Sequence, residues 1–397
     1  MVRAIPDPSA FARDFRLDPS VVYLNHGSFG ACPVPVQEAQ RRHRDRVEAD
    51  AVRFYVDDLW PLMDRSRDAL APVVGCDARD LVFVHNATTG VATVLHNLEL
   101  RAGDEILVTN NEYTACMNNC RAVAARAGAT VVAADLPWPM PGPDAAFDAV
   151  MARVTDRTRV AMISLVTSAT GIRLPAERII AALGERGIET ILDAAHGPGC
   201  VPMDLDAWSP AWATGNCHKW LCSPKGAAFL FVRRDRQDGF RPLVLSNDAE
   251  RLDAATARTR RPHFHHEFDY AGTDDMSPYL TVADAAAYLS GVMDGGIEAV
   301  MAANHALCVQ GRDIVCDALG VQPPAPESML GPMATLTLPA GAPDAETLKA
   351  RLYDEWRIQI PVWGTPGGTT SIRLSAQIYN SVAQYEYLGE ALRAELG

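Results

Sequence analysis

Seven short β-rich runs alternate with helical stretches between residues 80 and 235, and this alternation restricts the fold more than any other feature of the chain. The runs are Leu81–Val84, Glu105–Thr109, Thr130–Ala134, Val160–Val166, Thr190–Leu192, Ala211–Thr214 and Ala227–Val232. Such alternation is typical of a mainly parallel, doubly wound sheet, in which ligands bind beyond the carboxyl ends of the strands. We therefore expect the motifs that follow these runs to meet in one cleft.

The pattern changes after Arg234, where an irregular stretch precedes two helical segments and three further β-rich runs. These are Tyr279–Met293, a continuation to about Leu319, Met333–Leu338, Ile358–Val362 and Thr370–Ser375, followed by a final helix. A chain of 397 residues exceeds one ordinary domain. The sequence predicts an N-terminal segment (1–20), a large α/β domain (21–275) and a smaller α+β domain (276–397).

Composition excludes several classes of function. A net charge of −13 disfavours nucleic acids and anionic membranes as partners, and no run of eighteen apolar residues predicts a membrane span. The first residues contain no apolar leader, and the nine cysteines form no regular framework, so we expect a cytoplasmic protein with reduced thiols. The absence of a Walker motif and of GxGxxG argues against ATP and dinucleotides.

Only three of the 36 basic residues are lysines: Lys219, Lys225 and Lys349. Arginine stays protonated, so chemistry that needs a neutral amine has three candidates. Lys219 lies in Thr214–Trp220, directly after a β-rich run, where burial and a nearby cation would lower its pKa and allow attack on an aldehyde. The alternative is a surface lysine.

The run Ile191–Leu192 ends in Asp193, and His196 follows three residues later. A carboxylate at the base of a cleft can pair with a protonated pyridine nitrogen, an interaction of about 4 kcal/mol at 4 Å before desolvation. Such a pair keeps the ring an electron sink. Asp193 alone would serve equally well as a metal ligand or a helix N-cap.

Two further motifs are suited to anions. The stretch His85–Gly90 leads into an amphipathic helix, whose N-terminus is a potential anion site, although Thr88 or Thr89 could be only a cap. Arg373 lies in a β-rich run near the C-terminus, and its planar guanidinium matches a substrate carboxylate. A structural salt bridge is the alternative for Arg373.

Six motifs, in this order and spacing, resemble class V aminotransferase-fold pyridoxal-phosphate (PLP) enzymes, and specifically the isopenicillin N epimerase-like branch. They are Tyr23–Gly30, Asn86–Thr89, Asp193–His196, Gly215–Leu221, Gly272–Thr273 and the segment from Arg373 to Asn380. The resemblance runs from about residue 20 to the C-terminus. It implies a PLP fold-type I homodimer with a seven-stranded, mainly parallel sheet and an active site at the subunit interface.

The resemblance also implies roles for individual residues. Lys219 would carry PLP as a Schiff base and move the proton, while Asp193 would hold the ring nitrogen and Tyr113 would stack on the ring. His196 would lie near the ring hydroxyl. The expected remaining cofactor contacts are Ala87, Thr88, Thr89, Ser168, Asn216, His218 and, from the neighbouring subunit, Thr273. The expected substrate contacts are Arg373, Asn25, His26, Gly27 and Asp274.

Two departures from the branch concern the substrate. The branch usually has Gly-Thr-Arg-Asp where this chain has Gly272–Asp275, so Asp274 replaces a cation. Asp274 would then favour a cationic or hydroxyl-rich substrate, or would instead pair with a nearby arginine. No cysteine occurs from Trp363 to Ile372, where desulfurases of the class carry their nucleophile, so we do not expect a persulfide mechanism.

A dense cluster of His263, His265, His266 and Glu267 is a further candidate site. Strand-like alternation would place His263 and His265 on one face and His266 on the other, which disfavours a shared metal site. We expect this segment at the rim of the active site or at an interface, and we expect no metal.

The leading hypothesis is a PLP-dependent lyase that carries out C–S β-elimination on an S-substituted L-cysteine. Epimerisation at Cα is the main alternative, with reprotonation by Tyr113 or a bound water. Decarboxylation-coupled deamination and transamination remain open, because these reactions share an electron-rich Cα. A noncatalytic binding or regulatory module is the alternative outside enzymes.

Overall fold

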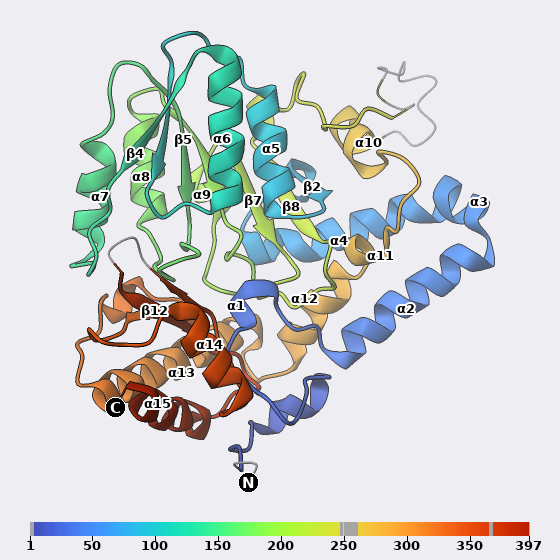
Figure 1. The fold of residues 1–397 in the computed structure, drawn as a ribbon. Coiled ribbons are helices and arrows are strands. Elements are labelled where there is room, and N and C mark those ends of the chain that lie inside the picture. Colours follow the sequence, from blue (N-terminus) through green and yellow to red (C-terminus); the bar gives the residue numbers. More distant parts are fainter. Residues whose placement is uncertain (1–3, 247–248, 250–260, 365–367, 397) are drawn as a thin grey trace.

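A seven-stranded sheet forms the centre of the computed structural model, which describes residues 4–246, 249, 261–364 and 368–396 (Figure 1). In spatial order its strands are β2 (Leu81–Val84), β8 (Ala228–Val232), β7 (Trp212–Asn216), β6 (Glu189–Asp193), β5 (Thr158–Ser164), β3 (Glu105–Thr109) and β4 (Thr130–Ala134). All neighbours from β7 to β4 pair in parallel, and only β8 runs antiparallel to both of its neighbours. The mainly parallel sheet predicted from the alternation is confirmed.

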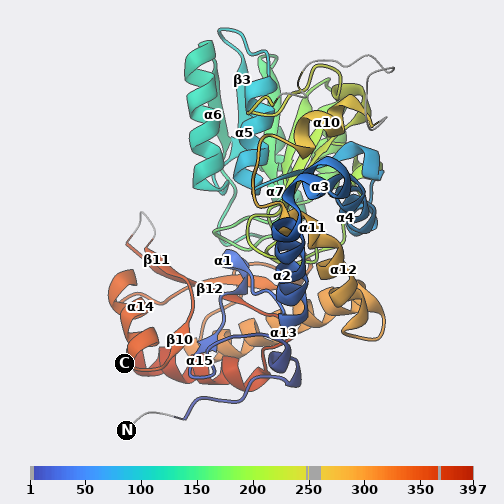
Figure 2. The ribbon, with the colours of Figure 1, turned by 90° about the vertical axis from the view of Figure 1, so that its right-hand side faces the viewer.

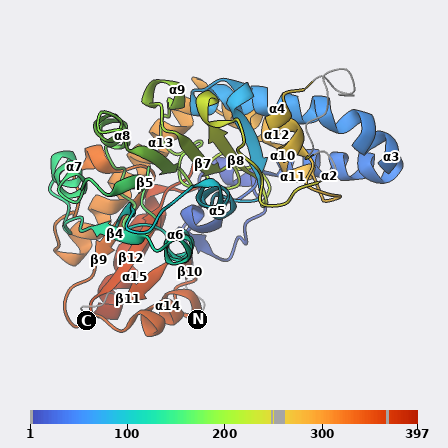
Figure 3. The same cartoon turned by 90° about the horizontal axis from the view of Figure 1, so that it is seen from above.

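Helices cover both faces of this sheet, as a doubly wound fold requires. Seen from above, α5 and α6 lie on one face and α8 and α9 on the other (Figure 3). The helices that follow strands β2 to β6 are α5 (Ala87–Asn97), α6 (Thr114–Ala127), α7 (Pro143–Met151), α8 (Ala176–Gly184) and α9 (Leu205–Trp208). Gly90 allows α5 to approach the sheet closely, because a Cβ there would come within 2.1 Å of Thr214 Oγ1 on β7.

The C-terminal part forms a second, antiparallel sheet with the order β11-β12-β9. Its elements are α13 (Gly296–Leu319), β9 (Met333–Thr337), α14 (Ala345–Asp354), β10 (Ile358–Gln359), β11 (Val362–Gly364), β12 (Thr370–Ser375) and α15 (Val382–Leu396). Strand β1 (Val22–Tyr23) pairs in parallel with β10, so an early segment joins this part of the molecule. In Figures 1 and 2, α1 (His26–Phe29) lies between the two sheets. The predicted division at residue 275 stays a prediction.

Two long helices, α2 (Val34–Ala49) and α4 (Leu59–Val74), project from the molecule and give it an asymmetric outline (Figure 1). The short helices α3 (Ala51–Arg53) and η2 (Phe54–Asp58) connect them. Helices α11 (Ser277–Leu280) and α12 (Val282–Gly291) pack against both α2 and α4. The remaining short helices are η1 (Ala10–Asp14), η3 (Ala78–Asp80), η4 (Arg234–Arg236) and η6 (Glu327–Met329). No helix in the described part of the chain is both long enough and apolar enough to cross a membrane.

The histidine cluster lies in a helix, α10 (His263–Asp269), so the strand-like alternation expected for it is wrong. The reason is the i, i+4 pair of Phe264 and Phe268, whose rings lie 5.1 Å apart and are buried in the core below the helix. His263 pairs with Glu267 across one helical turn, at 3.3 Å. His265 Nε2 lies 3.1 Å from the Arg79 carbonyl oxygen, so this ring joins α10 to the backbone of η3.

Helix α10 is fixed to α4 by buried ion pairs. Arg67 (1% exposed) donates to one carboxylate oxygen of Asp269 (0% exposed) at 2.6 Å, and Arg261 donates to the other at 2.7 Å. Asp64 accepts from both arginines. Asp269 is the fully buried acceptor of the two, so it joins α10 to α4 in the interior.

We predict that Asp269→Asn destabilises the chain by about 3 kcal/mol, because it leaves two arginines with one fewer negative partner in the interior. The midpoint of urea unfolding measures this loss. Asp144→Asn is the matched control, since the exposed Asp144–Arg178 pair contributes at most about 1 kcal/mol. Equal midpoints for the two variants would contradict the prediction.

Candidate active site

The carboxyl ends of the parallel strands meet at one edge of the large sheet and bring polar side chains together there. Ser164 ends β5, Asp193 ends β6 and Asn216 ends β7, and all three line one cavity of about 420 Å³. Its lining comprises Gly27, Ser28, Phe29, His85, Asn86, Ala87, Thr88, Tyr113, Cys116, Ser164, Val166, Ser168, Asp193, Ala195, His196, Asn216, His218, Lys219, Gly226 and Arg373. The cleft predicted at the strand ends is therefore present.

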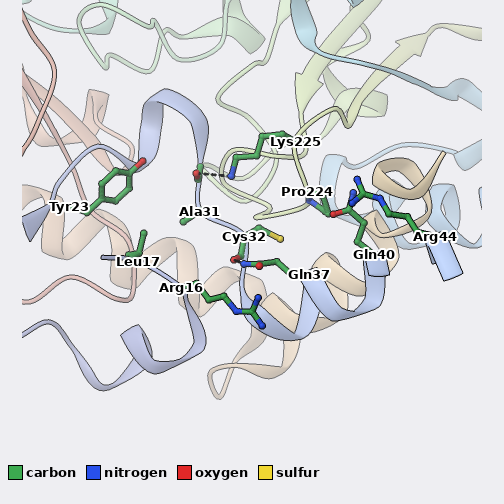
Figure 4. Close-up of a pocket in the computed structure, with 11 residues that line it drawn as sticks. Arg16, Leu17, Tyr23, Ala31, Cys32, Gln37, Gln40, Arg44, Pro224 and Lys225 are labelled. Carbon is green, nitrogen blue, oxygen red and sulfur yellow. Dashed lines mark hydrogen bonds between the residues drawn. The ribbon is translucent and has the colours of Figure 1, made fainter. Parts of the chain in front are cut away.

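A larger cavity, of about 520 Å³, lies beside Pro224 and Lys225 (Figure 4). It is lined by side chains such as Tyr23, Gln37 and Arg44, together with Lys225, whose Nζ donates to the Gly30 carbonyl at 3.1 Å. No carboxylate lines it among the described residues. We choose the 420 Å³ cavity as the candidate site because of its chemistry and not its size.

Lys219 is the lysine suited to amine chemistry. It is partly buried in the cavity, whereas Lys349 is exposed on α14 and Lys225 is bound to a backbone carbonyl. Burial lowers the pKa of Lys219 to about 8, against the opposing effect of Asp193, and Arg373 lowers it further. At pH 7 about a tenth of this amine is therefore neutral, far more than for an exposed lysine.

Asp193 is buried at the base of the cavity. Its Oδ1 accepts the Ala195 N–H at 3.0 Å, and its Oδ2 accepts the Cys116 thiol at 3.3 Å. Burial raises the pKa of Asp193, while these hydrogen bonds and Lys219 lower it. A buried carboxylate that lacks an arginine partner is suited to a positively charged ring nitrogen.

The N-terminus of α5 opens into the same cavity. Asn86 Oδ1 caps it by accepting the Thr89 N–H at 2.9 Å, and Asn216 Oδ1 accepts the Ala87 N–H at 2.9 Å. Thr88 lies between these two contacts and lines the cavity. The positive end of the helix dipole at this N-terminus favours anions, and Asn216 ties the turn to the end of β7.

Arg373 reaches the cavity from β12, although it is only 5% exposed. Its Nη1 donates to the Ser168 carbonyl, its Nη2 donates to Ser28 Oγ at 3.1 Å, and its Nε has no hydrogen-bond partner. Burial lowers the pKa of Arg373 to about 10, and no carboxylate of the described residues pairs with it. An incoming carboxylate would restore the missing partner.

The structure separates the predicted site residues into two groups. Those that line the cavity are Gly27, Ala87, Thr88, Tyr113, Ser168, Asp193, His196, Asn216, His218, Lys219 and Arg373. Asn25 and His26 lie outside it: Asn25 Oδ1 accepts from Ser28 Oγ at 2.6 Å, and His26 Nε2 lies 3.0 Å from the Lys219 carbonyl oxygen. His26 is buried and supports the Lys219 loop from behind.

Thr89, Thr273 and Asp274 line an adjacent cavity of about 290 Å³. His85 lines both cavities, and its Nε2 lies 3.5 Å from Asp274 Oδ2. The neighbouring Arg44 pairs instead with Asp275, at 2.8 Å. Within the described residues, Asp274 therefore faces a histidine and not an arginine. None of His263, His265 and His266 lines the candidate site, and their expected place at its rim or at an interface stays a prediction.

Sequence reasoning missed Glu112, which precedes Tyr113. This buried carboxyl accepts from Thr109 Oγ1 at 2.7 Å, from the Ser164 N–H at 3.2 Å and from Ser164 Oγ. Burial raises its pKa to about 7. Glu112 ties the loop that bears the half-exposed Tyr113 to the ends of β3 and β5. An acid beside an aromatic residue, just after a β-rich run, was the available signal.

Trp220 was also missed as a site residue. It is fully buried next to Lys219, and its Nε1 donates to His196 Nδ1 at 3.1 Å. The other nitrogen of His196, Nε2, lies 3.1 Å from Lys219 Nζ. Burial lowers the pKa of His196 well below its usual value, and Lys219 lowers it further, so the ring is neutral.

Known proteins resemble this chain over nearly its whole length. An isopenicillin N epimerase from Amycolatopsis lactamdurans is 33% identical over 387 residues, which cover 95% of this chain and 96% of the relative. A putative L-cysteine desulfhydrase 2 from Oryza sativa subsp. japonica is 29% identical, covering 98% of this chain and 87% of the relative.

Solved structures share the fold. A variant of the protein C-DES, with glycine covalently linked to its PLP cofactor, superposes with a TM-score of 0.81 at 21% identity, over 97% of this chain and 99% of that one. The sequence profile of the family Aminotransferase class-V matches residues 52–384. The chain therefore belongs to the class-V aminotransferase family.

Proposed function

We propose that this chain is a PLP-dependent lyase that cleaves the C–S bond of an S-substituted L-cysteine by β-elimination. The observation that carries the proposal is the partly buried amine of Lys219 in one cavity with Asp193 and Arg373. Its relatives include a putative L-cysteine desulfhydrase, which is named for a reaction of cysteine.

The residues of the cavity fit PLP on three independent features. The capped N-terminus of α5 at Thr88 would hold the phosphate, together with Asn216 and His218. Asp193 would hold the ring nitrogen, and Lys219 Nζ would carry the covalent link. When bound, PLP supplies a ring that withdraws electrons from Cα of the substrate.

The chain's own residues then orient the substrate and move its protons. Arg373 would bind the substrate carboxylate, since its guanidinium is buried without an acidic partner. The released Lys219 amine would take the proton from Cα, and elimination at Cβ would expel the sulfur-linked group as a thiol. Tyr113 would cover the ring from the loop that Glu112 anchors.

A persulfide mechanism lacks a nucleophile in the described part of this cavity. Cys116 is the one cysteine that lines it, and its thiol donates to Asp193. Burial raises the pKa of Cys116 far above the ordinary value, with Asp193 as the next cause, so the sulfur stays protonated. Trp363 and Gly364 contain no thiol, and residues 365–367 lie outside the described residues but contain no cysteine.

Epimerisation at Cα is the second candidate, because an isopenicillin N epimerase is 33% identical. It needs a second proton donor on the face opposite Lys219, a role for which Tyr113 lines the cavity. The two reactions are separated by incubating the loaded enzyme in D₂O with S-substituted L-cysteines. Release of pyruvate, ammonia and thiol supports the lyase, whereas deuterium at Cα with inversion and no thiol supports the epimerase.

The proposal includes a homodimer in the cytoplasm. Thr273 does not line the candidate cavity of its own chain, which agrees with a contact from a neighbouring subunit. Phe29 and Tyr113 are 69% and 50% exposed at the cavity, so they offer an apolar rim for a second copy. Sedimentation equilibrium tests this part: a monomer that binds PLP and turns over would contradict it.

We predict that Lys219→Ala folds but loses the covalent cofactor link and at least about a thousandfold in kcat, because no other cavity residue offers an amine. Borohydride reduction followed by peptide mass spectrometry locates the link in the wild-type chain. Lys349→Ala, an exposed lysine on α14, is the control and should keep both properties. Reduced cofactor on Lys225 or Lys349 in the wild-type chain would refute the assignment.

We predict that Asp193→Asn lowers kcat by about a hundredfold or more, since the ring nitrogen loses its charged partner, while the affinity for PLP falls much less. Titration with PLP and steady-state rates at saturating cofactor measure the two effects. Glu105→Gln is the matched control, because Glu105 is a buried carboxylate at the N-terminal end of β3, whereas the cavity lies at the carboxyl ends of the strands. An unchanged kcat in Asp193→Asn would remove Asp193 from the mechanism.

A further inference from the structure

Three side chains next to the candidate reaction centre form a directed hydrogen-bond chain. Trp220 Nε1 donates to His196 Nδ1 at 3.1 Å, and His196 Nε2 lies 3.1 Å from Lys219 Nζ. Trp220 is fully buried and His196 nearly so. Solvent therefore does not compete for the two nitrogens of the His196 ring.

The chemistry of the indole fixes the direction of this chain. An indole N–H can only donate, so His196 Nδ1 must accept and carries no proton. A neutral imidazole has one N–H, which is then on Nε2 and points at Lys219. A neutral amine can accept that hydrogen bond through its lone pair, whereas a protonated amine offers three donors and no acceptor.

We propose that Trp220 is a positioning residue for the reaction: its indole N–H fixes the proton of His196 on Nε2, and this favours the neutral form of the Lys219 amine over the ammonium. The inference rests on the proposed function in taking Lys219 as the reactive amine. It adds the reason why a chain with so few lysines places a tryptophan directly after this one.

The sign of the effect follows from what protonation of Lys219 requires. With Trp220 present, the ammonium and the His196 Nε2–H are two donors facing each other. If the His196 proton moves to Nδ1, two N–H donors face each other at the Trp220 contact instead. Trp220→Phe removes the indole donor, so the proton can move to Nδ1 without this repulsion. Nε2 then accepts a hydrogen bond from the Lys219 ammonium, and the pKa of Lys219 rises.

Other charged and titratable groups act on the same amine. Burial lowers the pKa of Lys219, Asp193 raises it, Arg373 lowers it, and Cys200 and Cys116 raise it. His26 and His218 also act on His196. Trp220→Phe removes the indole N–H together with part of a buried ring, so its titration must be compared with that of a variant that loses only packing.

The experiment is competitive labelling of the apo-protein. Limiting isotopic acetic anhydride is applied over a pH series, and peptide mass spectrometry compares Lys219 with Lys349 as an internal reference. We expect the half-labelling pH of Lys219 to lie below that of Lys349 and to rise by about one pH unit in Trp220→Phe, the effect of one hydrogen bond to a charged group. The pH profile of cofactor attachment should move in the same direction.

Trp212→Phe is the matched control. Trp212 is a buried tryptophan on β7, but its Nε1 has no hydrogen-bond partner among the described residues. It should lose packing without moving the titration of Lys219. A labelling curve for Lys219 that is the same in Trp220→Phe and in the wild-type chain would overturn the inference.

A second measurement is made on the wild-type chain and does not depend on the folding of Trp220→Phe. Nitrogen-15 spectra of histidine-labelled wild-type protein report which ring nitrogen carries the proton, and the His196 signal is assigned by its loss in His196→Gln. We expect the proton on Nε2, and a proton on Nδ1 overturns the inference. If wild-type Lys219 labels like Lys349, the proposed reactive amine fails, which is distinct from a failure of the role of Trp220.

Discussion

The parallel pairing of β5, β6 and β7 is the constraint on which the candidate site depends. Ser164 is in register with Asp193, and Asp193 is in register with Thr214, so the strands end together. The segments that follow β5, β6 and β7 therefore all begin at the carboxyl edge of the sheet. The acid, the helix N-terminus and the lysine consequently converge, although they come from segments far apart in sequence.

Charge inside the cavity is unbalanced in a way that suits anions. Lys219, Arg373 and the N-terminus of α5 all favour negative charge, whereas Asp193 is the carboxylate that faces them. Burial lowers the pKa of both Lys219 and Arg373, which indicates that nearby negative charge does not fully offset the loss of water around each cation. A cofactor phosphate and a substrate carboxylate would supply it. The net charge of −13 confines this attraction to the cavity instead of spreading it over the surface.

The sequence predicted the large sheet well, because its strands are apolar runs bounded by polar turns, and the residues at their ends follow from the topology. It was less informative where contacts join distant segments. Asn25 and His26 were expected at the substrate, yet His26 reaches Tyr379 and the backbone of Lys219. Cys116 meets Asp193 across 77 positions. The helix at 263–269 was misjudged because alternation of histidines was weighed above the spacing of Phe264 and Phe268.

The number of proton donors at Cα separates a lyase from an epimerase in this cavity. Lys219 is held by His196 on one side, with its pKa lowered to about 8, so it can take up a proton and return it. Tyr113 would have to serve the opposite face, but its side chain is half exposed and its hydroxyl makes no hydrogen bond within the described residues. A phenol without a neighbouring base transfers protons slowly at neutral pH. One well-tuned base is sufficient for β-elimination, since expulsion of the thiol replaces the second proton transfer at Cα. This asymmetry between the two faces is the physical reason why the function proposed for the chain is that of a lyase and not of an epimerase.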